Sequence, residues 1–316
     1  MKAIQVDEFG GPEVLQLREI DDPIAPAGAL LLKVNSAGVN YADTHQAENS
    51  YLSPAKLPLV PGAEVVGTTP DGRRVVALLA GAGGYAEQAV AWPSMIWDVP
   101  DAVSDGEALA VVLQGVTAWH LLRTSAHLSE GESVVVHAGA GGVGSLAVQL
   151  AKRWGAGRVI ATASTPEKRD LALQLGADVA VDSRAEDIKA ALIDANDGRK
   201  VDVILDMAGG PTFDAGLASL APFGRIVTYG MAGRVPPKPV EPGALMGRSR
   251  AVVGFWMVHC ATVPGMLDTA VNGLLELIEA GDLRVIVGGS YPLAEARRAH
   301  EDIRARGTTG KLVLTI

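Results

Sequence analysis

The sequence predicts an α/β protein in which a doubly wound parallel sheet is joined to a smaller, irregular β domain of barrel type. Three observations predict this. A strand, a glycine-rich turn and a helix follow one another at residues 134–152. Apolar strands alternate with helices after about residue 107, as in a parallel sheet covered by helices. Before that point, short strand patterns are punctuated by proline and glycine. A length of 316 residues also indicates two domains.

Residues 1 to about 100 read as short strands separated by turns. Residues 15–20 alternate between apolar and polar side chains, and residues 29–34 form a largely apolar run. The apolar run within 73–79 follows Pro70-Asp71-Gly72, which is a turn signal. This part of the chain is therefore expected to form the β domain.

From about residue 107 the pattern changes to alternating helices and strands. A helix is predicted at 107–124, before the strand of the glycine turn. The sheet is expected to contain strands at 134–136, 159–163, 179–181, 201–206, 225–229 and 251–255. Helices are expected between them at 143–154, 166–176, 185–195 and 213–220. The chain is expected to close with a helix at 265–280, the segment 283–287, a helix at 293–306 and a strand at 311–315.

The glycine turn predicts a dinucleotide site. Gly139, Gly141 and Gly144 stand in the G-x-G-x-x-G spacing between a β-branched strand and an amphipathic helix. The first glycine allows a tight turn, the second lets the backbone approach a pyrophosphate, and the third lets the helix pack closely on the sheet. The helix N-terminus offers unpaired N–H groups to an anion. The alternative is a small-residue turn of no special function, but the strand before and the helix after favour the Rossmann arrangement.

The end of the second strand of this sheet favours NADPH over NADH. An NAD site usually has a carboxylate about 20 residues after the glycine turn, whereas an NADP site has a cation and room for a phosphate. Residues 162–164 contain no carboxylate, and Ser164, Thr165 and Lys168 follow. Ser164 and Thr165 also suit the cap of a helix that begins at Pro166, and this role is compatible with phosphate binding.

Composition excludes several other classes of protein. The net charge of −9, without a basic run, argues against a nucleic-acid partner. The single cysteine, Cys260, allows no intrachain disulfide and suits a reducing compartment, so a cytoplasmic location is expected. Charges within residues 1–8 argue against a signal peptide. Residues 133–151 lack formal charge, but their glycine turn argues against a membrane helix and no membrane partner is expected.

A metal site is not expected either. The six histidines show no i,i+4 pair, and no C-x-x-C pair exists, so three ligands of a catalytic zinc are not apparent. No Gly-x-Ser-x-Gly nucleophile elbow is present. Polar residues do gather at 38–45, 57–64 and 114–118, and these segments are equally compatible with capped turns and with a functional site.

These segments resemble the medium-chain dehydrogenase/reductase superfamily, and within it the zinc-independent quinone oxidoreductases related to zeta-crystallin. The resemblance covers essentially the whole chain and includes Ala299-His300 and Gly310-Lys311 near its end. The other motifs are G-V-N-x-x-D at 38–43, L-P-x-x-P-G-x-E at 57–64, G-x-Y-A-E at 83–87, Q-G-x-T-A at 114–118, H-A-G-A-G-G-V-G at 137–144 and G-R-I-V-x-Y-G at 224–230.

The resemblance implies a domain plan and a set of site residues. Residues 1–115 would form a catalytic GroES-like domain, 116–256 an NADPH-binding Rossmann domain, and 257–316 the return of the chain to the catalytic domain. Asn40, Asp43 and Tyr51 would be the catalytic residues lining the substrate cleft. The cofactor-binding residues would be Asn40, Thr117, Gly139, Gly141, Gly142, Val143, Gly144, Ser164, Lys168, Tyr229, Gly230, Phe255, Trp256 and Lys311.

The sequence also departs from the family pattern. Ala63 stands where zinc-dependent relatives carry a histidine ligand. Ala47 and Tyr41 replace a frequent arginine and a frequent proline, which leaves the substrate open. Ser183 replaces a tyrosine that often lies near the 2′-phosphate, and this weakens the preference for NADPH.

The predicted function is an NADPH-dependent, metal-free quinone oxidoreductase acting on a quinone or similar conjugated carbonyl. The alternative enzyme is an enoyl-thioester or 2-alkenal reductase, because related trans-2-enoyl reductases carry a tyrosine at the position of Tyr51. A non-catalytic NADPH-binding protein is a third reading, which the acidic charge disfavours. The resemblance implies a homodimer, which edge-to-edge pairing of sheets near 251–255 would form.

Overall fold

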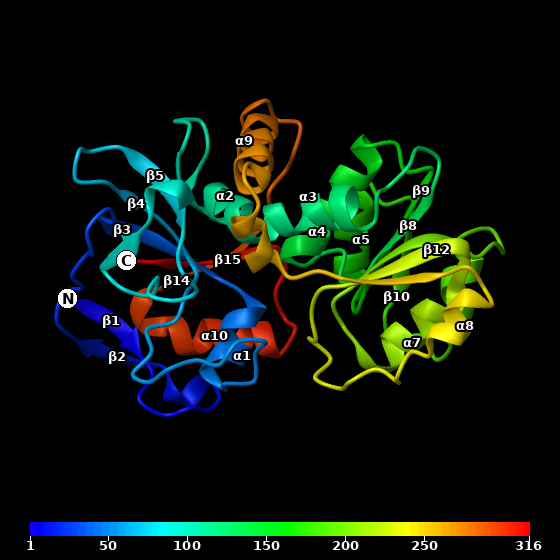
Figure 1. The fold of residues 1–316 in the computed structure, drawn as a ribbon, viewed down its shortest axis with the longest axis horizontal. Helices are drawn as coiled ribbons and strands as arrows, with labels where there is room; N and C mark the ends of the chain where they lie inside the picture. Colours follow the sequence, from blue (N-terminus) through cyan, green and yellow to red (C-terminus); the bar gives the residue numbers. More distant parts are fainter. The chain divides into compact units, whose positions relative to one another are not determined.

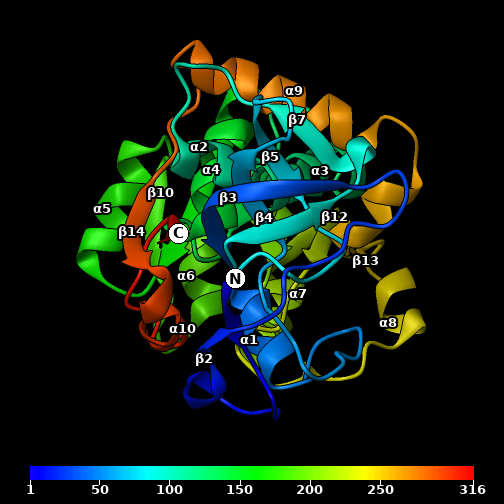
Figure 2. The ribbon, with the colours of Figure 1, turned by 90° about the vertical axis from the view of Figure 1, so that its left-hand side faces the viewer.

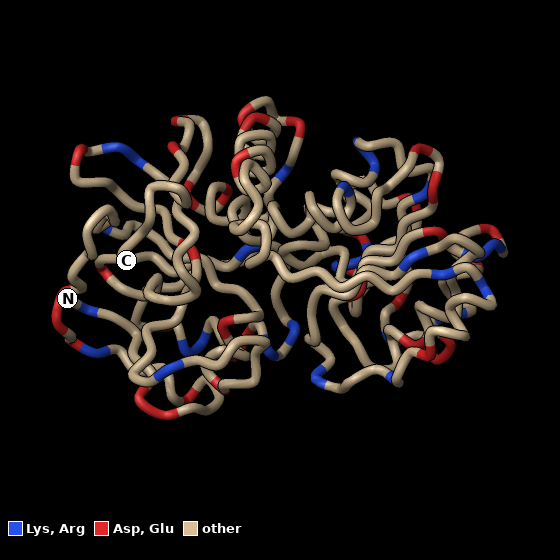
Figure 3. The backbone as a smooth tube through the Cα atoms, in the orientation of Figure 1, with Lys and Arg blue, Asp and Glu red and all other residues tan.

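A computed structural model describes residues 1–316, and the chain divides into two compact units (Figure 1). One unit comprises Met1–Leu113 together with Leu267–Ile316, and the other comprises Gln114–Met266. Acidic and basic residues are interspersed along both (Figure 3). Each unit has its own sheet, so each is described separately.

The unit Gln114–Met266 contains a six-stranded parallel sheet. Its strands run in the order β10-β9-β8-β11-β12-β13, which confirms the predicted Rossmann-type sheet. The order reverses between β8 and β11, and this is the point where open α/β sheets bind ligands. The strands are β8 (Ser133–Val136), β9 (Arg158–Ala163), β10 (Val179–Asp182), β11 (Val201–Asp206), β12 (Leu220–Thr228) and β13 (Ala251–Gly254).

Helices cover this sheet and bury its apolar side chains. Val135, Ile160 and Ile204 form a core with Leu192 and Phe213, which come from two neighbouring helices, α6 and α7. Strands buried on both faces need continuous β-branched residues, which is why these strands were recognisable in the sequence. The helices are α3 (Val116–His120), α4 (Gly142–Arg153), α5 (Pro166–Gln174), α6 (Ile188–Asp194), α7 (Gly210–Ser219) and α8 (Pro242–Met246).

The predicted helix at 107–124 is a continuous helical run of changing pitch. It begins with α2 (Asp105–Ala110), whose cap is the Ser104–Glu107 capping box. A π-helical segment at Val111–Gly115 separates α2 from α3, and a second one follows at Leu121–Ser125. The π-helical segments lie next to the Q-G-x-T-A motif, and such wide turns are frequent at functional sites.

The unit of residues 1–113 and 267–316 is built on a seven-stranded sheet. Its strands follow the order β14-β15-β3-β4-β5-β7, with β6 also paired to β3, and β1 pairs with β2 in a separate hairpin. The strands are β1 (Lys2–Gln5), β2 (Gln16–Glu19), β3 (Leu30–Val39), β4 (Glu64–Thr68), β5 (Arg74–Leu78), β6 (Gln88–Ala91), β7 (Ile96–Asp98), β14 (Val287–Pro292) and β15 (Lys311–Thr315). Figure 2 looks onto this unit and shows β3 beside β4.

The end of the chain lies inside this sheet. The last strand, β15, is parallel to β14 on one side and antiparallel to β3 on the other. Ile4, Leu32, Val65 and Leu314 belong to one buried cluster, so the first and last strands share a core. The helices are α1 (Tyr41–Ala47), α9 (Met266–Glu279) and α10 (Ala296–Arg304), with 3₁₀ turns at Pro12–Val14, Pro93–Met95 and Leu293–Glu295. A further 3₁₀ turn, Met257–Thr262, belongs to the other unit.

Several short elements of this unit differ from expectation. The strand predicted at 29–34 continues to Val39, because Ser36 and Ala37 pair with both β4 and β15 and Gly38 pairs with β15. Helix α1 occupies part of the polar segment 38–45. Residues 133–151 form β8, the glycine turn and most of α4, and no helix in the structure is both long and apolar enough to span a bilayer.

Candidate active site

The glycine turn joins β8 to α4 at the carboxyl edge of the parallel sheet. The N–H of Gly141 donates to the carbonyl of Ala138 over 2.8 Å, and Ala138 has a positive φ of 53°. Helix α4 starts at Gly142, and its N-cap, Gly141, provides no side chain to satisfy the first N–H groups. The N-terminus of this twelve-residue helix therefore keeps backbone donors for an anion.

Three glycines of the turn, Gly139, Gly142 and Gly144, occupy places where a side chain would collide. A Cβ on Gly139 would lie 2.7 Å from the Cβ of Ala161 in β9. A Cβ on Gly144 would meet the carbonyl of Ala138, and one on Gly142 would meet the side-chain amide of Gln114. The third glycine thus packs the helix against its own turn, while the first packs the turn against the neighbouring strand. This compact turn fits a diphosphate that approaches the backbone closely.

The end of β9 combines a helix cap with positive charge. The hydroxyl of Thr165 accepts a hydrogen bond from the backbone N–H of Lys168 over 3.3 Å, so Thr165 caps α5. Ser164, directly before it, is half-buried. Burial and the nearby guanidinium of Arg184 lower the pKa of Lys168. Arg184 follows the neighbouring strand β10 and was missed in the sequence, although it stands next to Ser183.

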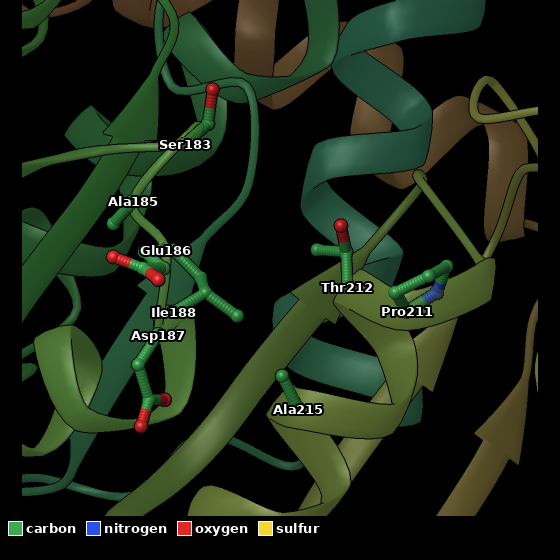
Figure 4. Close-up of a pocket in the computed structure, with 8 residues that line it drawn as sticks. All are labelled: Ser183, Ala185, Glu186, Asp187, Ile188, Pro211, Thr212 and Ala215. Atoms are coloured by element: carbon green, nitrogen blue, oxygen red, sulfur yellow. The ribbon is translucent and has the colours of Figure 1, made fainter.

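A groove of about 330 Å³ lies beyond the carboxyl end of β10 (Figure 4). One wall is the segment before α6, and the other is the first turns of α7. The hydroxyls of Ser183 and Thr212 lie at one end of it, whereas the carboxylate of Asp187 accepts the N–H of Ala190 over 2.9 Å and caps α6. The lining residues are Ser183, Ala185, Glu186, Asp187, Ile188, Pro211, Thr212 and Ala215.

A buried carboxyl group stands at the end of β11. Asp206 accepts the backbone N–H of Gly209 over 3.1 Å, and burial raises its pKa to about 6. Burial and the charge of Asp206 raise the pKa of Tyr229 well above its ordinary value. Asp206 was not singled out from the sequence, although an acid followed by Gly209-Gly210 at a strand end is a recognisable signal.

Aromatic residues follow the next two strands. Tyr229 and Gly230 are half-buried at the end of β12. Phe255, just after β13, stacks on His120 with 6.5 Å between ring centroids. The ring of Trp256 contacts that of His259 edge-on at 5.3 Å. Thr117 is buried on α3, and the cofactor roles of these residues remain predictions.

In the other unit, Asn40 connects β3 to α1. The carboxylate of Asp43 accepts the backbone N–H of Asn40 over 2.8 Å, which ties the helix start to the strand end. Both residues are buried. The G-V-N-x-x-D motif is thus a helix cap, and its two polar residues also join a larger buried network.

Glu64 and Lys311 form a buried ion pair beside Asn40. Their side chains are both inaccessible to solvent, and the Lys311 ammonium contacts Glu64 Oε1. Glu64 Oε1 also accepts Asn40 Nδ2–H over 2.8 Å, while Lys311 Nζ donates to Asn40 Oδ1 over 3.2 Å. Lys311 was predicted to lie near the cofactor. That role remains a prediction, and the partners observed for its ammonium are Glu64, Asn40 and the carbonyl of Val39.

A second branch of the network runs from Asp43 to His300. The Tyr85 hydroxyl donates to Asp43 Oδ2 over 2.9 Å and lies 3.1 Å from His300 Nε2. Burial, assisted by the charge of Glu64, raises the pKa of Asp43 to about 6. Burial lowers the pKa of His300 to about 4 and raises that of Tyr85. Tyr85 and His300 lie in motifs of the family resemblance but had been given no role.

Tyr51 packs in a short row of rings with Tyr41 and His45. His45 stacks on Tyr51 at 6.2 Å and contacts Tyr41 edge-on at 5.4 Å. The Nδ1 atom of His45 lies 3.0 Å from the Ser50 hydroxyl, which holds the imidazole in place. His45 therefore packs against Tyr51, whose catalytic role remains a prediction.

Two family models match the chain. The model described as an alcohol dehydrogenase GroES-like domain matches residues 26–101, and the model described as a zinc-binding dehydrogenase matches residues 142–272. The side chains present do not fit a zinc ion, because nowhere in the structure do three or more His, Cys, Asp or Glu residues gather in a way that would hold a metal.

Full-length relatives are more specific. Quinone oxidoreductase of Pseudomonas aeruginosa is 34% identical, with 99% of each chain covered. A mycobacterial protein solved in complex with NADPH is 38% identical with a TM-score of 0.93, and each chain is fully covered. Escherichia coli quinone oxidoreductase complexed with NADPH is 31% identical, also with full coverage and a TM-score of 0.93.

Proposed function

The chain belongs to the zeta-crystallin-like quinone oxidoreductase family of the medium-chain dehydrogenase/reductase superfamily, and from this membership we propose that it is an NADPH-dependent quinone oxidoreductase. The observation that carries the proposal is the similarity of the whole chain to quinone oxidoreductases. Two of the solved structures that it resembles contain NADPH. The compact glycine turn and the open N-terminus of α4 support it, because they suit a diphosphate.

In this proposal, separate groups of residues hold the parts of NADPH. Gly139, Gly141, Gly142, Val143 and Gly144 accommodate the pyrophosphate. Ser164 and Lys168 bind the 2′-phosphate. The nicotinamide is held by Asn40, Thr117, Tyr229, Gly230, Phe255 and Trp256, and Lys311 acts on it through the amide of Asn40. When bound, NADPH supplies the hydride that reduces a conjugated carbonyl.

The catalytic part of the proposal rests on orientation and proton supply. Asn40 orients its ligand through an amide that is itself held by Glu64 and Lys311. Tyr51, supported by His45, holds the proton that the reduced oxygen takes up. Asp43 fixes the backbone of Asn40. The chemistry is proposed to be zinc-independent, since the side chains present do not assemble a zinc site.

The domain roles follow from the same assignment. Residues 1–115 are proposed as the catalytic GroES-like domain, 116–256 as the NADPH-binding domain and 257–316 as the returning segment. We also propose a cytoplasmic homodimer that pairs through β13, which is the edge strand of the parallel sheet. Light scattering on the purified protein measures the dimer. The N–H of Phe255 donates to Thr228 of β12, so residues 251 and 253 also face β12 and residue 252 faces the open edge. Val252→Pro is expected to shift the protein toward monomer by removing a backbone donor from that edge.

The decisive experiment follows NADPH oxidation at 340 nm with a panel of quinones and a panel of 2-alkenals and enoyl thioesters. Quinones are expected to be the better substrates, with NADPH preferred over NADH and no loss of activity after dialysis against a chelator. Faster turnover of the enals would favour the alternative that Tyr51 suggests. Binding of NADPH without turnover of either panel would leave only a binding protein.

The kcat/KM of substituted proteins tests the roles proposed for Tyr51 and Asn40. Tyr51→Phe and Asn40→Ala are expected to lower kcat/KM by about 10- to 100-fold, the usual range for a lost proton donor or orienting group. Tyr291→Phe is the matched control, because its hydroxyl binds Asp302 and it has no proposed role. Full activity in both Tyr51→Phe and Asn40→Ala would overturn the catalytic assignment.

A further inference from the structure

The ion pair of Glu64 and Lys311 is buried more completely than stability alone explains. Both side chains are fully inaccessible to solvent. Removing two charges from water is costly, and apolar residues of similar volume often serve a protein core equally well or better. A pair kept in such a place suggests a task for its charges beyond packing.

The sheet makes room for this pair. Lys311 begins β15 and Glu64 begins β4, and both strands flank β3. Gly38 in β3 lies between them, and a Cβ there would stand 2.6 Å from Lys311 Nζ as well as colliding with Glu64 Oε1. The absence of a side chain at Gly38 therefore leaves the space in which the two charged groups meet.

The third member of this cluster is the amide of Asn40. An ammonium group has donors only, and a carboxylate has acceptors only. Lys311 therefore binds the oxygen of the amide at 3.2 Å, and Glu64 binds its nitrogen at 2.8 Å. An amide with neutral partners has two orientations of similar energy, whereas these two charges permit one.

We propose that Glu64 and Lys311 are positioning residues that fix the orientation of the Asn40 amide for the reaction. This inference rests on the proposed function, in which Asn40 orients the nicotinamide or the substrate. Which end of the amide faces a ligand decides whether Asn40 offers it a hydrogen-bond donor or an acceptor. Asp43 holds the backbone of Asn40 from the other side, so both the main chain and the side chain of this residue are fixed.

The test compares single and paired removal of the charges. Glu64→Gln or Lys311→Met alone leaves one buried charge without its partner, and Tm is expected to fall by roughly 5–10 °C. The double variant E64Q/K311M has neither charge and is expected to regain most of that Tm. Its kcat/KM for NADPH and quinone is nevertheless expected to stay about 10- to 100-fold below that of the wild type, because the amide is no longer oriented.

A matched control removes a half-buried ion pair from the other unit. Arg225 and Glu132 bind each other at 2.6 Å. The variant E132Q/R225M is expected to alter Tm while keeping kcat/KM within about two-fold of the wild type. Recovery of both Tm and kcat/KM in E64Q/K311M would overturn the proposal, because the pair would then be merely structural.

A measurement on the wild type depends neither on activity nor on the folding of the charge variants. In ¹H–¹⁵N spectra, the side-chain resonances of Asn40 are identified by their loss in Asn40→Ala. One Nδ2 proton is expected to be shifted downfield and protected from exchange by its bond to Glu64. Two rapidly exchanging protons would contradict a fixed amide. An inactive wild type with a protected amide would contradict the proposed function but leave the orientation of the amide intact.

Discussion

Asp43 and His300 lie at the two ends of a hydrogen-bonded row through Tyr85, and burial shifts their pKa values in opposite directions. The pKa of Asp43 rises from 3.8 to about 6, so the folded state holds a proton that the unfolded state has lost. Its stabilising effect is complete below pH 3.8 and is lost as the pH rises through 6. The pKa of His300 falls from 6.5 to about 4, so its stabilising effect is present above pH 6.5 and is lost as the pH falls through 4.

The two residues therefore offset each other between about pH 4 and 6, and single substitutions should reveal this. In Asp43→Asn, the free energy of unfolding is expected to rise with pH more steeply than in the wild type, by about 1.4 kcal/mol per pH unit. In His300→Gln, the slope is expected to change by a similar amount in the opposite direction. Urea unfolding at several pH values measures both. Parallel curves for the three proteins would show that neither group titrates as described.

Gly38 is a third residue for which the effect of a substitution on stability follows from its surroundings. In Gly38→Ala, the new methyl group displaces Lys311 or Glu64 from the buried pair. The free energy of unfolding is expected to fall by about 3 kcal/mol, since both overpacking and an impaired ion pair contribute. Gly243→Ala is the control, because nothing lies within 4 Å of a Cβ at that position. A loss below 1 kcal/mol for Gly38→Ala would contradict the tight packing.

Several residues of the buried network around Asn40 were predicted from the sequence, but the contacts between them were not. Asn40, Asp43 and Lys311 were predicted as site residues through the family resemblance. The bond between Lys311 and Glu64 joins residues 247 positions apart, and no local pattern encodes such a contact. The same holds for Tyr85 and His300, which are 215 positions apart. The pairing of β15 with β3 and of β3 with β4 brings Lys311 and Glu64 together.

Among the elements, the start of α4 is the one whose geometry most directly determines cofactor binding. In Gly144→Ala, the methyl group meets the carbonyl of Ala138, so the helix must move away from its turn. NADPH affinity is expected to fall by at least about ten-fold, which corresponds to roughly 1.4 kcal/mol. Fluorescence titration measures it, with Gly243→Ala again as control. Unchanged affinity would mean that the cofactor does not bind at this turn.

The ends of β9 and β10 should determine the choice between NADPH and NADH. Lys168→Ala and Ser164→Ala are each expected to raise the Kd for NADPH by about 10- to 100-fold, the range for a hydrogen bond to a charged group. Arg184→Ala should act in the same direction, because its guanidinium lies near Lys168. The Kd for NADH should change little. Lys189→Ala, an exposed position on α6, is the control, and equal losses for both cofactors would contradict 2′-phosphate binding.

Helices and strands were predictable where burial requires a regular pattern of apolar residues. The central parallel strands β8, β9 and β11 are covered on both faces and read as apolar runs. All six parallel strands were predicted near their observed positions. The strands β1, β4, β6 and β7 have only three to five residues each and lack a sustained alternation. Helix α1 was hidden because its first turn carries Asn40 and Asp43, whose polarity suggested a loop. The π-helical segments within 105–125 leave no signal in the apolar spacing.

On the scale of the whole molecule, the chain leaves one compact unit near Leu113 and returns to it after Met266. The Rossmann-type sheet and the GroES-like domain were both predicted, and both are confirmed. The return of residues 257–316 to the first domain was predicted only through the family resemblance. Nothing in the tail itself specifies that β15 lies between β14 and β3.

The position of β15 makes the end of the chain indispensable. A chain that ends at Gly310 loses an interior strand and the cationic partner of Glu64. It is expected to be largely insoluble and to lack cooperative unfolding of the unit built from residues 1–113 and 267–316. A chain that ends at Thr315 keeps β15 and should behave like the wild type. Solubility and thermal unfolding measure the difference, and a stable chain ending at Gly310 would contradict the role given to β15.

The interior position of β15 also affects how the chain folds during synthesis on the ribosome. Residues 1–113 emerge first, yet their sheet remains incomplete until Lys311–Thr315 are added some two hundred residues later. At 5–20 residues per second this delay lasts about 10–40 s, during which residues 36–39 of β3 have an unpaired edge and Glu64 lacks the cation of Lys311. The first residues translated are thus among the last to reach their native state, and a holdase that shields the exposed edge of β3 would bind the nascent chain during this interval.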